Sequence, residues 1–258
     1  MTAAPSWWSS SLQLADLGVR QTLRQKILIG VGLALLFAIG LATAIRVGNG
    51  DEIPENVQAV QLFIMTPVVA PLVALLLGTN ALASEREGGT LTYLFTRPIP
   101  RAAAVIGKGV AAIIVADIAV ALGVVAAWLA GGAPDTNVAG ATLALVLETT
   151  ALTGVFVLLG TIVARSLYLG LVYIALFEGV LGNTIVARAG TTITYHARRL
   201  LSEWSANALI GNDFPLIYDG SVTTSVLVLL VVPVASLAAA AWWVEKREYG
   251  LKDRPNED

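Results

Sequence analysis

Long apolar segments separated by short polar links dominate the chain. A membrane-spanning helix needs about 20 mostly apolar residues to cross about 30 Å of hydrocarbon. Six segments meet this requirement: 27–45, 56–84, 103–130, 138–164, 167–187 and 222–244. The pattern predicts an all-α polytopic membrane protein with six transmembrane helices. Because no internal repeat or linker divides the chain, we expect a single transmembrane domain over residues 1–258.

The first 26 residues have the pattern of an amphipathic helix rather than that of a signal peptide. Apolar residues recur at helical spacing along one face: Trp8, Leu12, Ala15, Val19 and Leu23. Charged residues lie on the other face: Asp16, Arg20 and Arg24. Such a helix can lie in the headgroup layer of a membrane. We predict an interfacial helix over residues 1–26; the alternative is an amphipathic helix packed on protein.

Lysine and arginine are distributed unevenly between the two sides of this predicted bundle. With the N-terminus inside, twelve of them fall in inner segments: Arg20, Arg24, Lys26, Arg86, Arg97, Arg101, Lys108, Arg165, Lys246, Arg247, Lys252 and Arg254. Four fall in outer segments: Arg46, Arg188, Arg198 and Arg199. Cytoplasmic loops carry the excess of positive residues. We therefore predict a multi-pass protein of the cell (plasma) membrane with both termini and the loop at 84–102 in the cytoplasm.

The predicted extracytoplasmic segment, residues 188–221, contains a second amphipathic stretch, "TTITYHARRLLSEW". Its apolar residues form one helical stripe: Ile193, Ala197, Leu200, Leu201 and Trp204. We interpret it as an amphipathic helix on the outer surface. The alternative is a re-entrant segment that changes the local topology.

Composition agrees with a membrane protein and removes several functional classes. Charged residues make up 13% of the 258 residues, against about 25% in soluble domains, and the mean hydropathy is +0.76. The net charge of −2 argues against a nucleic-acid partner. Without cysteine, and with His196 as the only histidine, thiolate metal sites and clusters of several histidines are excluded, and we expect no bound metal. A lone histidine on an amphipathic stretch is more often structural.

The loop at 84–102 combines charged residues with a short apolar stretch. Its sequence runs "SEREGGTLTYLFTRPIPRA". The glycines Gly88 and Gly89 favour a helix break, Thr90 can cap a new helix, and Pro98 stops it. The intervening two turns carry Leu91, Tyr93, Leu94 and Phe95. A helix this short and apolar must bury its face on lipid, under the bundle or in a groove on another protein.

This loop resembles the signature of ABC type 2 transporter permeases. That pattern is an acidic pair, Gly-Thr-Leu, a short apolar helix, Pro-Ile-Ser/Pro-Arg and a downstream Gly-Lys. The matching residues are Glu85, Glu87, Gly89, Thr90, Leu91, Pro98, Ile99, Arg101, Gly107 and Lys108. The match departs mildly at Pro100, where serine is commoner. The stretch around Glu178, "LVYIALFEGVLGN", resembles the fifth helix of some members more weakly.

The resemblance implies the non-catalytic membrane subunit of an ABC exporter that works by alternating access. The loop would be a coupling helix that docks on a separate ATPase subunit, which uses ATP and Mg, while this chain binds no cofactor. The implied docking residues are Glu85, Arg86, Glu87, Gly88, Gly89, Thr90, Leu91, Leu94, Phe95 and Arg101. A second permease chain, as homodimer or heterodimer, would complete the pore in the lipid bilayer. The alternative for the loop is a solvated or interfacial segment.

Three acids fall within predicted spans: Asp117, Glu148 and Glu178. A charged acid at the centre of a membrane costs about 2.5–3.5 kcal/mol on insertion scales. One interpretation is a translocation path or a proton or cation site. The other is a protonated acid hydrogen-bonded to a neighbouring helix. Candidate partners are Thr149, Thr150, Thr153 and Tyr173.

Two further functional classes fit the sequence less well. A proton- or cation-coupled secondary transporter would use the three acids, but it would leave the loop at 84–102 unexplained and would commonly show an inverted repeat. A membrane enzyme has no visible catalytic motif, because neither HExxH nor GxSxG occurs. The chain also lacks a phosphate-binding loop: Ala102 and Gly109 stand where glycine and Ser/Thr are needed. Lys108 is then expected to extend toward the headgroups.

Overall fold

The protein is described from a computed structural model over residues 7–49, 60–87, 101–132, 137–163, 165–180, 190–205 and 220–246. Every regular element within these ranges is a helix. The all-α prediction is therefore confirmed for the described part of the chain.

Five helices are long and apolar enough to cross a membrane. They are α2 (Ile27–Asn49), η1 with α4 (Gln61–Val69 and Ala70–Glu87), α6 (Arg101–Gly131), α7 (Val138–Ile162) and α11 (Val222–Lys246). The predicted fifth span begins as α8 (Ser166–Tyr173) and continues as the π-helix η2 (Ile174–Val180). This apolar helix is shorter than a span, and residues 181–187 lie outside the described part. The described helices thus support five spans and do not establish the sixth.

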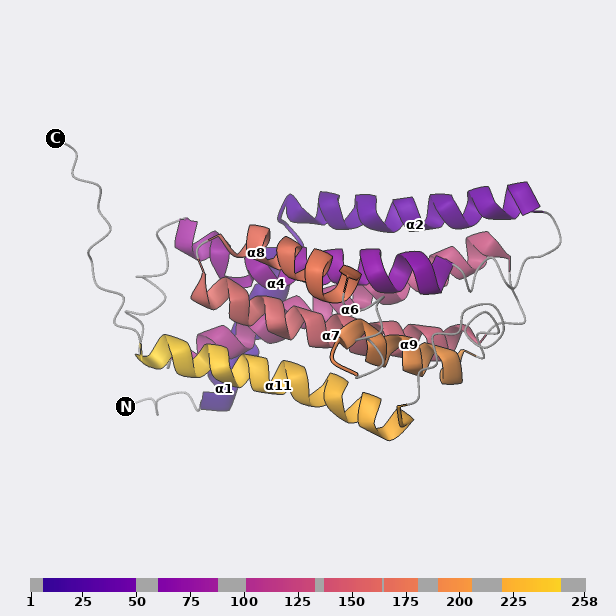
Figure 1. Ribbon diagram of the computed structural model, residues 1–258. Coiled ribbons are helices and arrows are strands. Elements are labelled where there is room, and N and C mark those ends of the chain that lie inside the picture. Colours follow the sequence, from indigo (N-terminus) through magenta and orange to yellow (C-terminus); the bar gives the residue numbers. More distant parts are fainter. Residues whose placement is uncertain are drawn as a thin grey trace.

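Helix α7 occupies the centre of the bundle. It packs against α4, α6, α8, α9 and α11, and Figure 1 shows it between α11 on one side and α4 and α8 on the other. Its apolar residues are buried on several faces, as the fully buried Ala151, Leu152 and Val157 show. A helix that is apolar all round is suited to such a central position.

The first part of the second span is π-helical rather than α-helical. Pro67 lies inside η1, and the hydroxyl of Thr66 donates a 2.8 Å hydrogen bond to the carbonyl oxygen of Gln61. Proline removes a backbone donor, and neighbouring side chains in membrane helices compensate for such losses. The proline in this span therefore coincides with a π-helical stretch.

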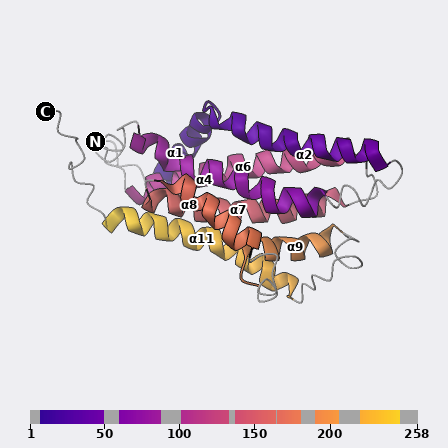
Figure 2. The same cartoon turned by 45° about the horizontal axis from the view of Figure 1, so that its top comes forward.

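The helix ends gather at two opposite ends of the bundle. Figures 1 and 2 both place α1 (Trp7–Thr22), the end of α4, the start of α6 and the end of α11 at one end. The end of α2, the start of α7 and α9 (Ile193–Trp204) lie at the other. The first group carries five of the twelve basic residues that were predicted to be cytoplasmic: Arg20, Arg86, Arg101, Lys108 and Lys246. We call these the basic end and the opposite end.

Helix α9 does not lie on the surface, so that prediction is wrong. Its residues 193–198, 200 and 201 are all buried, and it packs against α7, α11 and η1. The physical reason is that its polar side chains find partners inside the bundle instead of facing water. The structure favours the re-entrant alternative for this segment.

Candidate functional site

The predicted docking loop joins two helices that pack together at the basic end. Helix α4 ends at Glu87, α6 begins with the half-buried Arg101, and the two helices pack against each other. The predicted docking residues Gly88, Gly89, Thr90, Leu91, Leu94 and Phe95 lie outside the described residues, as do the side chains of Glu85, Arg86 and Glu87. Their docking role stays a prediction.

Helix α1 packs closely against α6. A side chain at Gly18 would place its Cβ only 2.8 Å from the Cβ of Ala111, so the two helices touch where both residues are small. Close approach through small residues is a common device of membrane helix packing. The helix therefore contacts protein on the side of Gly18, while its exposed Leu17 and the nearby exposed Leu23 point elsewhere. The interfacial position predicted for residues 1–26 stays a prediction.

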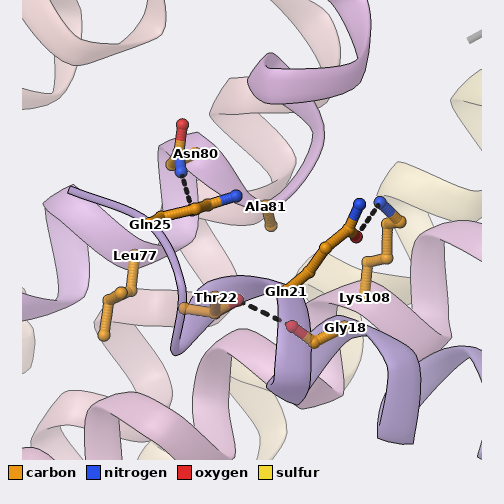
Figure 3. A pocket seen from close by; sticks show the side chains of 8 residues that line it. All are labelled: Gly18, Gln21, Thr22, Gln25, Leu77, Asn80, Ala81 and Lys108. Atoms are coloured by element: carbon orange, nitrogen blue, oxygen red, sulfur yellow. Dashed lines mark hydrogen bonds between the residues drawn. The ribbon is translucent and has the colours of Figure 1, made fainter. Parts of the chain in front are cut away.

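A small polar hollow lies where α1, α4 and α6 meet (Figure 3). The amide of Asn80 donates to Oε1 of Gln25, and Nζ of Lys108 lies 3.5 Å from Oε1 of Gln21. Each glutamine thus connects α1, or the turn that follows it, to one of the two helices that bound the predicted docking loop. Neither glutamine was singled out from the sequence, because amide side chains carry no periodic signal.

Lys108 lies in this hollow rather than in open solvent. It is 6% exposed and is covered by α1. The expectation that it extends to the headgroups is therefore wrong. Its charge is instead enclosed about two turns into α6, beside the amide of Gln21.

Glu178 forms the second candidate site, because its carboxylate caps the N-terminus of α9. The backbone N–H of Ile193 donates to Oε1 at 3.3 Å, and that of Thr194 donates to Oε2 at 2.9 Å. The hydroxyl of Tyr173 also donates to Oε1, at 3.0 Å. The first N–H groups of a helix have no partner within the helix, and the helix dipole favours a negative charge there.

Thr192 completes the cap. Its hydroxyl accepts the N–H of Tyr195 at 3.2 Å, in the usual manner of a threonine N-cap. With the two bonds to Glu178, three successive N–H groups at the start of α9 are paired with side-chain oxygens. A threonine immediately before an apolar-periodic run is a helix-start signal, so Thr192 was detectable from the sequence.

Glu148 contacts the same helix from α7. The hydroxyl of Thr194 donates to its Oε1 at 3.2 Å. Glu148 is fully buried, and its Oε2 has no hydrogen-bond partner. Thr194 therefore joins two carboxylates, since its N–H binds Glu178 and its hydroxyl binds Glu148.

Asp117 lies apart from these two acids. Its Oδ2 accepts a 2.8 Å hydrogen bond from the hydroxyl of Thr150, one of the partners proposed from the sequence. Thr150 follows Glu148 by two residues, and positions two apart on a helix point about 200° away from each other. Asp117 thus belongs to the α6–α7 contact, while Glu148 faces α9.

The partners proposed for the other acids are partly correct. Tyr173 does bind Glu178. Thr149 donates to the backbone of Leu145 within α7 instead, and no partner is found for the hydroxyl of Thr153. The partner of Glu148, Thr194, was missed because it comes from a segment 46 residues later in the chain.

His196 has structural partners. Its Nδ1 lies 3.0 Å from the hydroxyl of Ser225 on α11, and its Nε2 lies 3.0 Å from the carbonyl oxygen of Gly190. These contacts fasten α9 to α11 and agree with the structural interpretation of the histidine. Within the described ranges, no three residues among His, Asp and Glu gather as ligands for a metal ion.

Comparison with known proteins identifies the family. A model of the family described as "ABC-2 family transporter protein" matches residues 12–248. The chain belongs to the ABC-2 transporter family. This finding confirms the family resemblance of the loop between α4 and α6.

Two curated relatives share the family character. The "Probable ABC transporter permease protein NosY" of Pseudomonas aeruginosa is 33% identical over 180 residues, which cover 66% of this chain and 57% of that protein. The protein of the same name from Stutzerimonas stutzeri is 30% identical over 168 residues, 63% of this chain and 55% of the relative. The matched region thus spans little more than half the length of these relatives. This ABC-2 chain is a membrane protein with several apolar helices.

Proposed function

We propose that this ABC-2 chain is the permease subunit of an ATP-driven exporter in the plasma membrane. The observation that carries the proposal is the signature of the family in residues 84–108, which follow one spanning helix and begin the next. Family membership over residues 12–248 supports the same assignment. ATP and Mg would be bound by a separate ATPase subunit, and both termini would be cytoplasmic.

The packing of α4 and α6 supports a mechanical role for the loop between them. A push on the loop from an ATPase would act on α4 and α6, and both helices pack directly against the central α7. A packed core does not deform continuously but switches between distinct packings. A small displacement of α4 and α6 can therefore be passed on as a larger movement. Alternating access would follow when two permease chains, in a homodimer or heterodimer, rock together.

The contacts of α1 support the view that it belongs to the same mechanical unit as α4 and α6, the two helices that bound the loop. It touches α6 at Gly18, and the chain following it reaches α4 through Gln25 and Asn80. The first helix would therefore move together with the two helices that bound the loop. In this arrangement the amphipathic helix would follow the movements of α4 and α6 in addition to attaching to the membrane.

The alternative of a secondary transporter receives no support from the acids. Both carboxylate oxygens of Glu178 are engaged by backbone N–H groups of α9, and Asp117 is bound by Thr150. These contacts support a role of Glu178 and Asp117 in helix–helix packing. They do not form a continuous chain of carboxyl groups across the bundle among the described residues.

The proposed function is tested by co-expressing the tagged chain with a candidate ATPase subunit. We expect a nucleotide-hydrolysing complex to co-purify with the chain in detergent. The matched control is an ATPase whose phosphate-loop lysine is replaced by alanine: it should still co-purify, but without hydrolysis. If the folded chain purified without any ATPase, the proposal would be contradicted.

A further inference from the structure

The inference concerns how α9 is held inside the bundle. Its C-terminal end is attached at the opposite end of the molecule, where the side-chain amide of Asn137 donates a 2.7 Å hydrogen bond to the carbonyl oxygen of Trp204. The same side chain accepts the N–H of Gly140 and so caps α7. A Cβ at Gly140 would lie 2.0 Å from that carbonyl oxygen, so the backbones of α7 and α9 touch here.

The N-terminal end of α9 lies much deeper. Thr194 and Trp204 are ten residues apart, which is about 15 Å along a helix. Thr194 meets Glu148, the eleventh of 25 residues of α7, so it lies close to the middle of that helix. Helix α9 therefore enters the bundle from the opposite end and reaches about halfway through it.

Polar contacts hold this deep end. Glu178 binds two backbone N–H groups, Thr194 binds Glu148, and His196 binds Ser225. Water can replace such contacts at small net cost when a path opens, because a buried hydrogen bond contributes only about 1 kcal/mol relative to water. These polar contacts hold the deep end in addition to the apolar packing of Ile193, Leu200 and Leu201 in the core.

Two further features belong to this deep contact. The Oε2 of the fully buried Glu148 has no hydrogen-bond partner, and an unsatisfied buried oxygen in a native structure calls for an explanation such as stored strain or an unfilled position. Glu178 lies in a π-helical turn, a distortion often found at functional sites.

We propose that Glu178, with Glu148 and Thr194, is a latch that keeps α9 inserted as a movable plug of the pathway. Glu178 is the positioning residue, because it alone pairs two N–H groups at the deep end of α9. Glu148 supports it through the hydroxyl of Thr194. Release of these contacts lets α9 swing about its attachment at Asn137 and Trp204. The role of the plug in transport rests on the proposed function, whereas the latch itself does not.

The absence of cysteine makes the latch directly measurable. A single cysteine replaces the buried Ala197 of α9, and its reaction with a charged, membrane-impermeant maleimide is followed in vesicles without nucleotide. We expect slow labelling in the otherwise native chain. Glu178→Gln, which removes the negative charge and one acceptor, should accelerate labelling about tenfold.

Two further variants make the result specific. Thr194→Val removes the hydroxyl but keeps the N–H, so labelling should rise about threefold; Thr194→Ser keeps both groups and should leave it unchanged. A control cysteine at the buried Ala116 of α6 should stay protected in every variant. Equal labelling at position 197 with and without the Glu178→Gln substitution would overturn the latch. A parallel rise at position 116 would also overturn it, because Glu178 would then stabilise the whole bundle.

A second arm separates the latch from the proposed function. The same labelling is repeated with the ATPase subunit, with and without ATP. Under the proposed function, ATP changes the labelling of Ala197→Cys in the chain with Glu178 intact. If Glu178→Gln accelerates labelling but ATP has no effect, the latch stands and the ATP-driven transport fails. If ATP acts but Glu178→Gln does not, the latch fails and the transporter stands.

Discussion

Replacing Gly78 by leucine should destabilise the bundle by about 3 kcal/mol or more, the upper range for overpacking a core. A Cβ at this position would lie 2.7 Å from the Cβ of Phe156 and 2.9 Å from the carbonyl oxygen of Thr153. On the facing helix, a Cβ at Gly160 would lie 2.8 Å from the carbonyl oxygen of Thr79. The two glycines therefore allow α4 and α7 to touch backbone to backbone.

The matched control is Gly40→Leu in α2. No atom lies within 4 Å of a Cβ at Gly40, so the larger side chain has room, and stability should change by less than about 0.5 kcal/mol. Thermal unfolding of the purified chain in detergent measures both variants. If both lost stability equally, or if Gly78→Leu were neutral, the close contact of α4 and α7 described here would be wrong.

Phe95→Asp should abolish association with the ATPase subunit. The proposed docking helix is only about two turns long, so each apolar residue matters, and a carboxylate placed in an apolar groove loses its hydration without gaining a partner. Aromatic anchors of this kind account for about 2–4 kcal/mol of binding free energy, so affinity should fall about thirtyfold or more. Co-purification from cells that express both subunits measures the loss.

The control for this variant places the same charge elsewhere at the basic end. Gln13 is exposed on α1, and Gln13→Asp should leave co-purification unchanged. Both variants should retain the thermal stability of the native chain, since neither change falls in the described core. Undiminished co-purification of Phe95→Asp would contradict the docking of this loop.

The hydrophobic pattern predicted the long helices well because their length and apolarity are imposed by the bilayer. Residues 138–164 were expected as one span, and α7 covers Val138–Ile162. The fifth segment was less predictable. Its apolar run predicts a span over 167–187, but the described helix ends at Val180, and composition alone does not reveal the π-helical turn around Glu178.

The position of α9 was predicted wrongly for an identifiable reason. Amphipathicity shows that a helix has a polar face, and the usual partner of that face is water. Here Thr194, His196 and Arg198 turn that face toward buried groups of other helices, including Glu148 and Ser225. A sequence without its fold does not indicate which of these two partners a polar face has.

The pairing of acids illustrates the same limit. Glu148 and Glu178 occur on different helices, and nothing in their spacing indicates that they meet. The structure joins them through Thr194, which comes from a third segment. By contrast, the bond between Asp117 and Thr150 could be anticipated, because α6 and α7 are consecutive spans with a short link and therefore pack side by side.

The central claim is that the loop between α4 and α6 is a cytoplasmic docking helix for an ATPase. It is tested most directly with a single cysteine at Leu94 in this cysteine-free chain, labelled with an impermeant maleimide from either side of the membrane. We predict reaction only from the cytoplasmic side in the chain alone, and strong protection once the ATPase subunit is bound. Reaction from the outer side, or unchanged labelling within the assembled complex, would contradict the account.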